Sequence, residues 1–142
     1  ILAPTRELAL QIHTELENFA KNTSLRSTVI FGGVGQNPQV RQLQKGVDVL
    51  VATPGRLLDL VGQGYVDLSM ICVLVLDEAD RLLDMGFIPD VKRIVQQTPK
   101  SRQSLLFSAT MSKGVSQLAR NMLRDPIRVD VSPKQPTVKK ID

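Results

Sequence analysis

Three carboxylates follow directly after one of the most apolar stretches of the chain. Residues 71–76 are all apolar or cysteine, and Asp77, Glu78 and Asp80 come next. Charges at the end of a buried strand are costly unless a cation or a hydrogen-bond donor compensates them. In folds that transfer phosphate, a carboxylate there holds Mg²⁺ through water, and a neighbouring one orients or deprotonates an attacking water. The alternative interpretation is a helix N-terminus, where acidic side chains interact favourably with the helix dipole.

Polar residues, prolines and glycines follow three other apolar runs. They are Pro4, Thr5, Arg6 and Glu7 after the opening Ile-Leu-Ala, Gly32 and Gly33 after residues 28–31, and Thr53, Pro54, Gly55 and Arg56 after residues 47–52. A helix start offers free amides to phosphate, and a glycine pair lets a nucleic acid strand approach the main chain. Taken singly, Gly-Gly is most often a turn, and Thr-Pro-Gly is most often a helix cap and bend.

A further polar group, Ser108, Ala109 and Thr110, follows the apolar run at residues 104–107. Its two hydroxyl groups can donate hydrogen bonds to a carboxylate. The alternative is that they cap the next helix, which the same side chains can do as well.

The elements that must position these groups alternate along the chain. Short runs rich in β-branched residues predict buried strands at residues 28–31, 47–52, 71–76 and 104–107, and alternation predicts a half-exposed strand at 127–131. Between them, apolar residues recur at helical spacing, as in Leu8, Ile12, Leu16 and Phe19. This order predicts an α/β fold, a parallel sheet with helices on both faces, and ligands at the carboxyl ends of its strands.

Composition excludes several classes of protein. The net charge is +4 over 142 residues, and residues 131–142 hold three lysines and one aspartate, which is half of that excess. Cys72 stands alone in an apolar run, so we expect it in the core of a cytoplasmic protein without disulfides. No apolar run could span a bilayer, so no membrane partner is expected. With 4% aromatic residues, base stacking is not expected to be the main mode of nucleic acid binding.

In order, the five strand ends carry Pro-Thr-Arg-Glu-Leu-Ala, Gly-Gly, Thr-Pro-Gly-Arg, Asp-Glu-Ala-Asp and Ser-Ala-Thr. This order resembles the first RecA-like domain of DEAD-box ATP-dependent RNA helicases over nearly the whole chain, and bacterial members in particular. The resemblance implies a P-loop NTPase type of fold with ATP and Mg²⁺ as cofactors. Residues 1–130 would be part of that domain, and residues 131–142 would be a linker to the second RecA-like domain of the same parent chain.

The resemblance also implies a role for each motif. Asp77 would bind Mg²⁺ through water, and Glu78 would be the general base for the hydrolytic water. Asp80 would pair with the segment of Ser108, Ala109 and Thr110, which would link the nucleotide state to RNA binding. The other three motifs would hold the RNA backbone without reading its base sequence.

One family feature is missing from the sequence. A phosphate loop ends in Gly-Lys-Ser/Thr, but none of the eight lysines follows a glycine. We therefore expect a fragment that cannot hydrolyse ATP alone. We also expect marginal stability, because the family's phosphate-loop strand would lie beside the strand that leads to Asp77 and its absence would leave unpaired edges. The alternatives are a catalytically inactive RNA-binding or interaction module with this fold, and a DNA helicase or another RecA-like ATPase.

Overall fold

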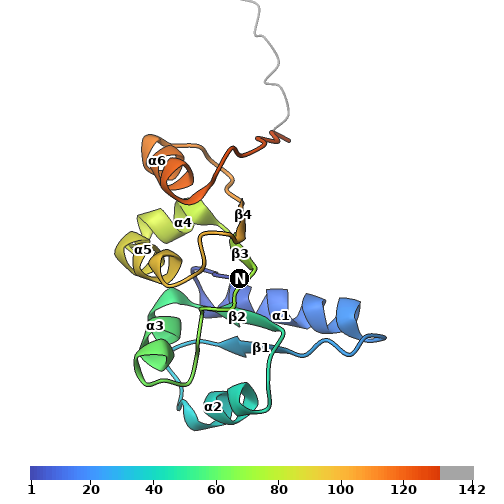
Figure 1. The fold of residues 1–142 in the computed structure, drawn as a ribbon. Coiled ribbons are helices and arrows are strands. Elements are labelled where there is room, and N and C mark those ends of the chain that lie inside the picture. The colour runs from blue at the N-terminus through green and yellow to red at the C-terminus, as the bar shows by residue number, and fades with distance from the viewer. Residues whose placement is uncertain (132–142) are drawn as a thin grey trace, which may run out of the picture.

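A computed structural model of the protein describes residues 1–131. Four parallel strands form the centre of this structure (Figure 1). Strand β1 (Ser27–Ile30) pairs with β2 (Val49–Ala52), and β3 (Val73–Leu76) pairs with β4 (Gln103–Leu106). Leu2 forms parallel bridges to Ala52 of β2 and to Leu76 of β3 and so joins the two pairs. The order across the sheet is therefore β1, β2, the segment at Leu2, β3 and β4. The four strands at residues 28–31, 47–52, 71–76 and 104–107 are confirmed, with ends shifted by a residue or two.

Helices cover both faces of this sheet, as the alternation of elements predicts. Helix α1 (Arg6–Ala20) lies to the right of the strands in Figure 1, and the other helices lie to their left and below. These are α2 (Asn37–Gln44), α3 (Pro54–Gly62), α4 (Ala79–Asp84), α5 (Ile88–Gln96) and α6 (Lys113–Met122).

Each face of the sheet has its own apolar core. Alternate residues of a strand point to opposite faces, so Ile30 and Ala52 enter the larger core while Val29 and Val51 face α1. Fully buried side chains of α3 and α5, such as Leu60 and Ile94, complete the larger core. The two cores hold the strands in place, and the strand ends position the motifs.

The predicted strand at residues 127–131 is wrong. The segment forms no strand, and Ile127, Val129 and Val131 are 92%, 78% and 89% exposed. A strand needs a neighbour to receive its hydrogen bonds, and no strand within residues 1–131 pairs with this segment. The predicted linker at residues 131–142 lies, apart from Val131, outside the described residues.

Two side chains expected in the core are exposed. Phe19 of α1 is 83% exposed, because this 15-residue helix is longer than the strands it covers. Its length is about 22 Å at 1.5 Å per residue, whereas a four-residue strand reaches only about 13 Å. Cys72 is exposed because it lies at the start of β3, where Val73, the first residue of the strand, is also 45% exposed.

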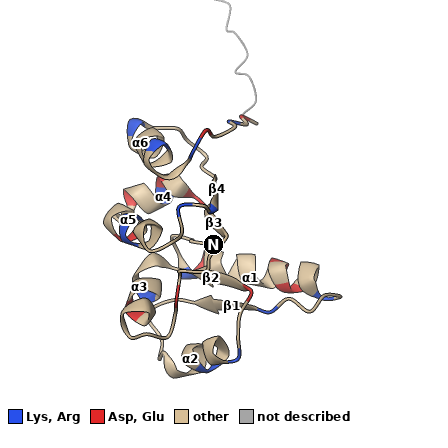
Figure 2. Cartoon of the chain, in the orientation of Figure 1, with Lys and Arg blue, Asp and Glu red and all other residues tan. Residues whose placement is uncertain are grey.

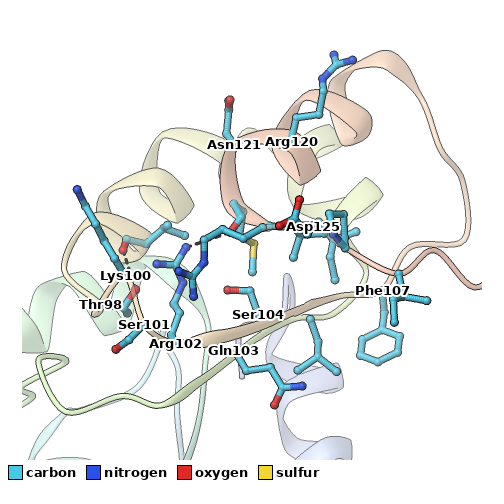
Figure 3. A pocket seen from close by; sticks show the side chains of 18 of the residues that line it. Thr98, Lys100, Ser101, Arg102, Gln103, Ser104, Phe107, Arg120, Asn121 and Asp125 are labelled. Carbon is cyan, nitrogen blue, oxygen red and sulfur yellow. Dashed lines mark hydrogen bonds between the residues drawn. The ribbon is translucent and has the colours of Figure 1, made fainter.

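The neighbours expected for the strand leading to Asp77 are also wrong. Strand β3 is bonded on both sides, since Leu2 donates to the Val75 carbonyl at 2.8 Å and Phe107 donates to the Leu76 carbonyl at 2.9 Å. Among residues 1–131, the unpaired edge on this side of the sheet belongs to β4 instead. A groove of about 1340 Å³ runs along that edge, with Gln103 and Ser104 on one side and Arg120 and Asn121 of α6 on the other (Figure 3).

Candidate functional site

All five motifs lie at the carboxyl ends of the strands, because parallel strands end on the same side of the sheet. The strand order divides them into two groups. The motifs after Leu2, β1 and β2 form one group, and the motifs after β3 and β4 form the other. The segment at Leu2, first in the chain, lies between β2 and β3, so its motif is the member of the first group next to the acidic residues.

The acidic group begins where β3 ends. Asp77 is half-buried, its amide donates to the Leu2 carbonyl at 3.0 Å, and its Oδ1 accepts from the Glu78 amide at 2.9 Å. Within residues 1–131, its Oδ2 has no hydrogen bond. Asp77 is thus held by its backbone on the central segment while one carboxylate oxygen remains available.

Glu78 adopts a strained backbone conformation. Its φ of 47° and ψ of 55° are left-handed, a region that non-glycine residues rarely occupy and that often marks a functional position. Immediately after it, the amide of Ala79 donates to the Phe107 carbonyl at 2.9 Å, which ties the start of α4 to the end of β4. This conformation turns the chain sharply from β3 into α4 with Glu78 at the corner.

The carboxylate of Glu78 is only partly satisfied. Its Oε2 is buried and, in the described part of the chain, has no hydrogen bond. The nearest cation is Arg81, whose Nη1 lies 3.5 Å away, beyond the distance of a well-formed hydrogen bond. Because buried polar atoms normally have a partner, this oxygen is suited to accept a proton or a bound water.

Asp80 connects the acidic cluster to the Ser-Ala-Thr segment. The hydroxyl Oγ1 of Thr110 donates to Asp80 Oδ2 at 3.1 Å, and Oδ1 of the same carboxylate accepts from the Arg81 amide. Ser108 donates instead to the Thr110 carbonyl at 2.7 Å, and Ala109 is exposed between them. Neither hydroxyl caps α6, whose N-cap is Ser112.

The second group starts at the N-terminus of α1. Thr5 caps this helix, since its Oγ1 accepts from the Leu8 amide at 3.2 Å. Pro4 is buried, whereas Arg6 and Glu7 are exposed. The guanidinium of Arg6 lies 5.6 Å from the centroid of the Phe31 ring, within range of a cation–π interaction.

The glycine pair forms an open turn after β1. Gly33 has a φ of 81°, which favours glycine, and a Cβ placed there would lie 4.0 Å from Arg6 Nη1. Gly32 has no heavy atom within 4 Å of the position a Cβ would take. The turn therefore offers exposed main chain directly beside a guanidinium.

Arg56 lies at the start of α3. Thr53 is the N-cap in an extended conformation, buried Pro54 opens the helix, and Gly55 is exposed. Half-buried Arg56 donates from Nη1 to Gln39 Oε1 at 3.1 Å and from Nη2 to the Val34 carbonyl at 2.8 Å.

Sequence reasoning missed Phe31 and Gln39, two residues that hold these groups in place. Gln39 is buried beside Val40 in the first turns of α2, and its Nε2 donates to the Phe31 carbonyl at 3.1 Å. The signal was a polar residue next to the apolar face of a short helix, directly after the glycine turn.

Charge alone does not mark the site. Basic and acidic residues are scattered over residues 1–131, with acidic residues on α4 and basic residues on α2 and α6 (Figure 2). Within these residues no group of three or more histidine, cysteine or acidic side chains could hold a metal ion directly. Nor does any helix there combine the length and apolarity that crossing a bilayer requires. A cation at Asp77 would therefore need water or phosphate oxygens as its further ligands.

A family model described as DEAD/DEAH box helicase matches residues 1–118. The chain belongs to this family. It is 52% identical over 135 residues to a DEAD-box ATP-dependent RNA helicase 20 from Oryza sativa subsp. japonica, covering 95% of this chain and 27% of the relative. It is 51% identical over 131 residues to an ATP-dependent RNA helicase DBP2 from Eremothecium gossypii, covering 92% of this chain and 24% of the relative. The chain thus spans about a quarter of the length of these relatives.

Solved structures of DEAD-box helicases share the RecA-like fold of this chain. A hypothetical ATP-dependent RNA helicase from Sulfolobus tokodaii matches with a TM-score of 0.82 and 34% identity, covering 87% of this chain and 37% of that one. The yeast DEAD-box splicing factor Prp28 matches with a TM-score of 0.81 and 35% identity, covering 87% and 30%. The relatives with the higher identities come from a plant and a fungus, so they give no support to the predicted likeness to bacterial members.

Proposed function

We propose that the full-length protein is an ATP-dependent RNA helicase, which couples ATP binding and hydrolysis to the unwinding of RNA duplexes or the remodelling of RNA–protein complexes. Residues 1–130 would be part of its first RecA-like domain, and residues 131–142 would link it to a second. The observation that carries the proposal is that Asp77 and Glu78 lie at the same end of the sheet as two helix starts with an arginine each and an open glycine turn. Relatives that are named ATP-dependent RNA helicases support it.

The end of β3 fits a magnesium–nucleotide complex. The free Oδ2 of Asp77 would hold Mg²⁺ through water, and Mg²⁺, when bound, neutralises charge on the phosphates. The Oε2 of Glu78, which has no hydrogen bond within residues 1–131 and only a 3.5 Å ion pair with Arg81, would take the proton of the attacking water. The chain contains no Gly-Lys-Ser/Thr sequence to hold the β- and γ-phosphates, so we expect residues 1–142 alone not to hydrolyse ATP.

The second group fits a phosphodiester backbone. The N-termini of α1 and α3 point free amides to the same edge, and Arg6 and Arg56 add positive charge beside them. Thr5 and Thr53 lie at those helix starts, and Gly32 and Gly33 leave the main chain between them accessible. Such contacts are made to phosphate and sugar, so RNA binding would be independent of base sequence.

The bond between Thr110 and Asp80 is the proposed coupling element. It joins the helix that follows Glu78 to the loop that follows β4. Binding or hydrolysis of the nucleotide at Asp77 and Glu78 would therefore shift the Ser-Ala-Thr loop. The loop would pass this shift to the second domain and the RNA.

The proposal is tested by Glu78→Gln in the full-length protein. Removing the general base should lower RNA-stimulated phosphate release by about 10²- to 10⁴-fold. RNA affinity in the presence of a non-hydrolysable ATP analogue should not change. Glu15→Gln, an exposed site on α1, is the matched control and should keep the wild-type rate. A Glu78→Gln protein that hydrolyses ATP at the wild-type rate would contradict the assignment.

The same assay separates the alternatives. A wild-type protein without RNA-stimulated phosphate release would favour the inactive RNA-binding or interaction module. Equal stimulation by DNA and RNA of the same sequence would favour a DNA helicase or another RecA-like ATPase, since the 2′-hydroxyl distinguishes the two polymers. The cytoplasmic location stays a prediction, which imaging of the tagged protein in its cell would test.

A further inference from the structure

Gln39 is a buried polar residue beside the second group, the motifs after Leu2, β1 and β2 that we propose bind phosphate. Only 8% of it is exposed, and it lies in the first turns of α2, outside every motif that the sequence singled out. Its side chain nevertheless contacts two segments of that group. Buried amides of this kind are retained where their hydrogen bonds specify a geometry.

The two ends of its amide perform different tasks. Nε2 donates to the Phe31 carbonyl at 3.1 Å, and Oε1 accepts from Arg56 Nη1 at 3.1 Å. A carbonyl requires a donor and a guanidinium requires an acceptor, and an amide side chain supplies both at once. Glutamate at this position would supply only acceptors, and leucine would supply neither.

This amide fixes the plane of the Arg56 guanidinium. Nη1 is held by Gln39 and Nη2 by the Val34 carbonyl at 2.8 Å, so α2 and the glycine turn clamp the group from two directions. An arginine has five N–H donors, and these contacts leave the remaining ones for a ligand. Of the guanidinium nitrogens of Arg56, Nη1 and Nη2 are the ones that donate hydrogen bonds within residues 1–131.

The same amide reaches the second arginine indirectly. It holds the carbonyl of Phe31, whose ring lies 5.6 Å below the Arg6 guanidinium. Two residues further on, a Cβ placed at Gly33 would lie 4.0 Å from Arg6 Nη1, so this turn also lies beside Arg6. Thus Gln39, Phe31 and the glycine turn form one structure between Arg6 and Arg56.

We propose that Gln39 is a positioning residue for phosphodiester binding: it pre-orients Arg56 and the glycine turn without touching the RNA. The proposal rests on the proposed function, because it assumes that Arg56 binds RNA phosphate. A guanidinium fixed before binding loses less conformational freedom when the phosphate arrives, so removal of the clamp lowers affinity although the charge remains.

The experiment measures ATP hydrolysis by the full-length protein as a function of the concentration of single-stranded RNA. Gln39→Leu should raise the RNA concentration for half-maximal stimulation about tenfold, the effect of losing a hydrogen bond to a charged group. The rate at saturating RNA and the KM for ATP should stay at wild-type values. Gln44→Leu, an exposed glutamine on the same helix, is the matched control and should behave as wild type.

Two further variants separate positioning from a merely structural role. Gln39→Glu keeps an acceptor for Arg56, so its loss of RNA affinity should be smaller than that of Gln39→Leu. If position 39 only filled space, leucine would be tolerated better than a buried glutamate. In an Arg56→Ala background, Gln39→Leu should add little, because both changes remove the same interaction.

The outcomes distinguish the inference from the proposed function. If Arg56→Ala weakens RNA stimulation but Gln39→Leu does not, the positioning role is refuted and the RNA site stands. If Gln39→Leu lowers the saturated rate and protein stability together with RNA affinity, the residue is structural and the inference also fails. If Arg56 binds a phosphate, Arg56→Ala should reduce the slope of log affinity against log salt concentration by about 0.7. If Arg56→Ala changes neither RNA affinity nor this slope, the assumed RNA role of Arg56 is wrong.

Discussion

A methyl group added at Gly32 or at Gly33 would separate two reasons for having glycine there. Gly33 has a φ of 81°, whereas Gly32 has a conformation open to any residue and no heavy atom within 4 Å of the position a Cβ would take. If the turn matters only for its shape, alanine should be harmful at Gly33 alone. If RNA must approach the main chain, alanine should be harmful at both positions.

The expected stability changes follow from the backbone. Alanine in the left-handed region costs about 1–2 kcal/mol. Replacing glycine also reduces the freedom of the unfolded chain, which stabilises by about 0.4–1 kcal/mol where the conformation fits. Gly32→Ala should therefore be neutral or slightly stabilising. The free energy of unfolding of Gly33→Ala should be about 1–2 kcal/mol lower than that of Gly32→Ala.

The expected change in RNA affinity is different. A methyl group that prevents one main-chain contact with the phosphate backbone costs about 1 kcal/mol, which is about a fivefold loss of affinity. This loss should appear in Gly32→Ala as well as in Gly33→Ala. Gly62→Ala, at the end of α3 with nothing within 4 Å of its Cβ position, is the control and should bind RNA as wild type does.

The assays are urea unfolding and fluorescence anisotropy with a single-stranded RNA, both on the full-length protein with a non-hydrolysable ATP analogue in the binding assay. Equal RNA affinity of Gly32→Ala and Gly62→Ala would refute the main-chain approach. Equal stability of Gly32→Ala and Gly33→Ala would refute the argument from the left-handed backbone.

Two further predictions concern α4. Thr110→Val removes the donor to Asp80 and should reduce duplex unwinding more than RNA-stimulated ATP hydrolysis. Thr110→Ser keeps the hydroxyl and should restore unwinding. An equal loss of both activities in Thr110→Val would argue against coupling. Gly114→Val should destabilise by about 1–3 kcal/mol through overpacking, because a Cβ at Gly114 of α6 would lie 2.6 Å from Leu83 Cδ2 of α4. Urea unfolding should show partial recovery when Leu83→Ala is added, and no recovery would show that the clash is not the cause.

Local features of the sequence could be predicted well. The apolar runs ending at Ala52 and Leu76 identified their strands, and helical spacing identified α1. These signals are local, since burial on one or both faces selects residue types at fixed intervals. They were weakest where burial depends on a neighbour that is distant in sequence, as the exposed Phe19, Cys72 and Ile127 show.

The order of amino acids specifies which chemical groups follow each strand: the carboxylates of Asp77 and Glu78, the glycine turn, and the arginines at two helix starts. How these groups combine depends on the folded chain. The position of Leu2 between β2 and β3 separates the acidic cluster from the motifs that we propose bind phosphate. Folding also brings Gln39 onto Arg56, across 17 residues of chain. Strand order and buried side-chain contacts arise from packing between distant segments, which no local pattern encodes.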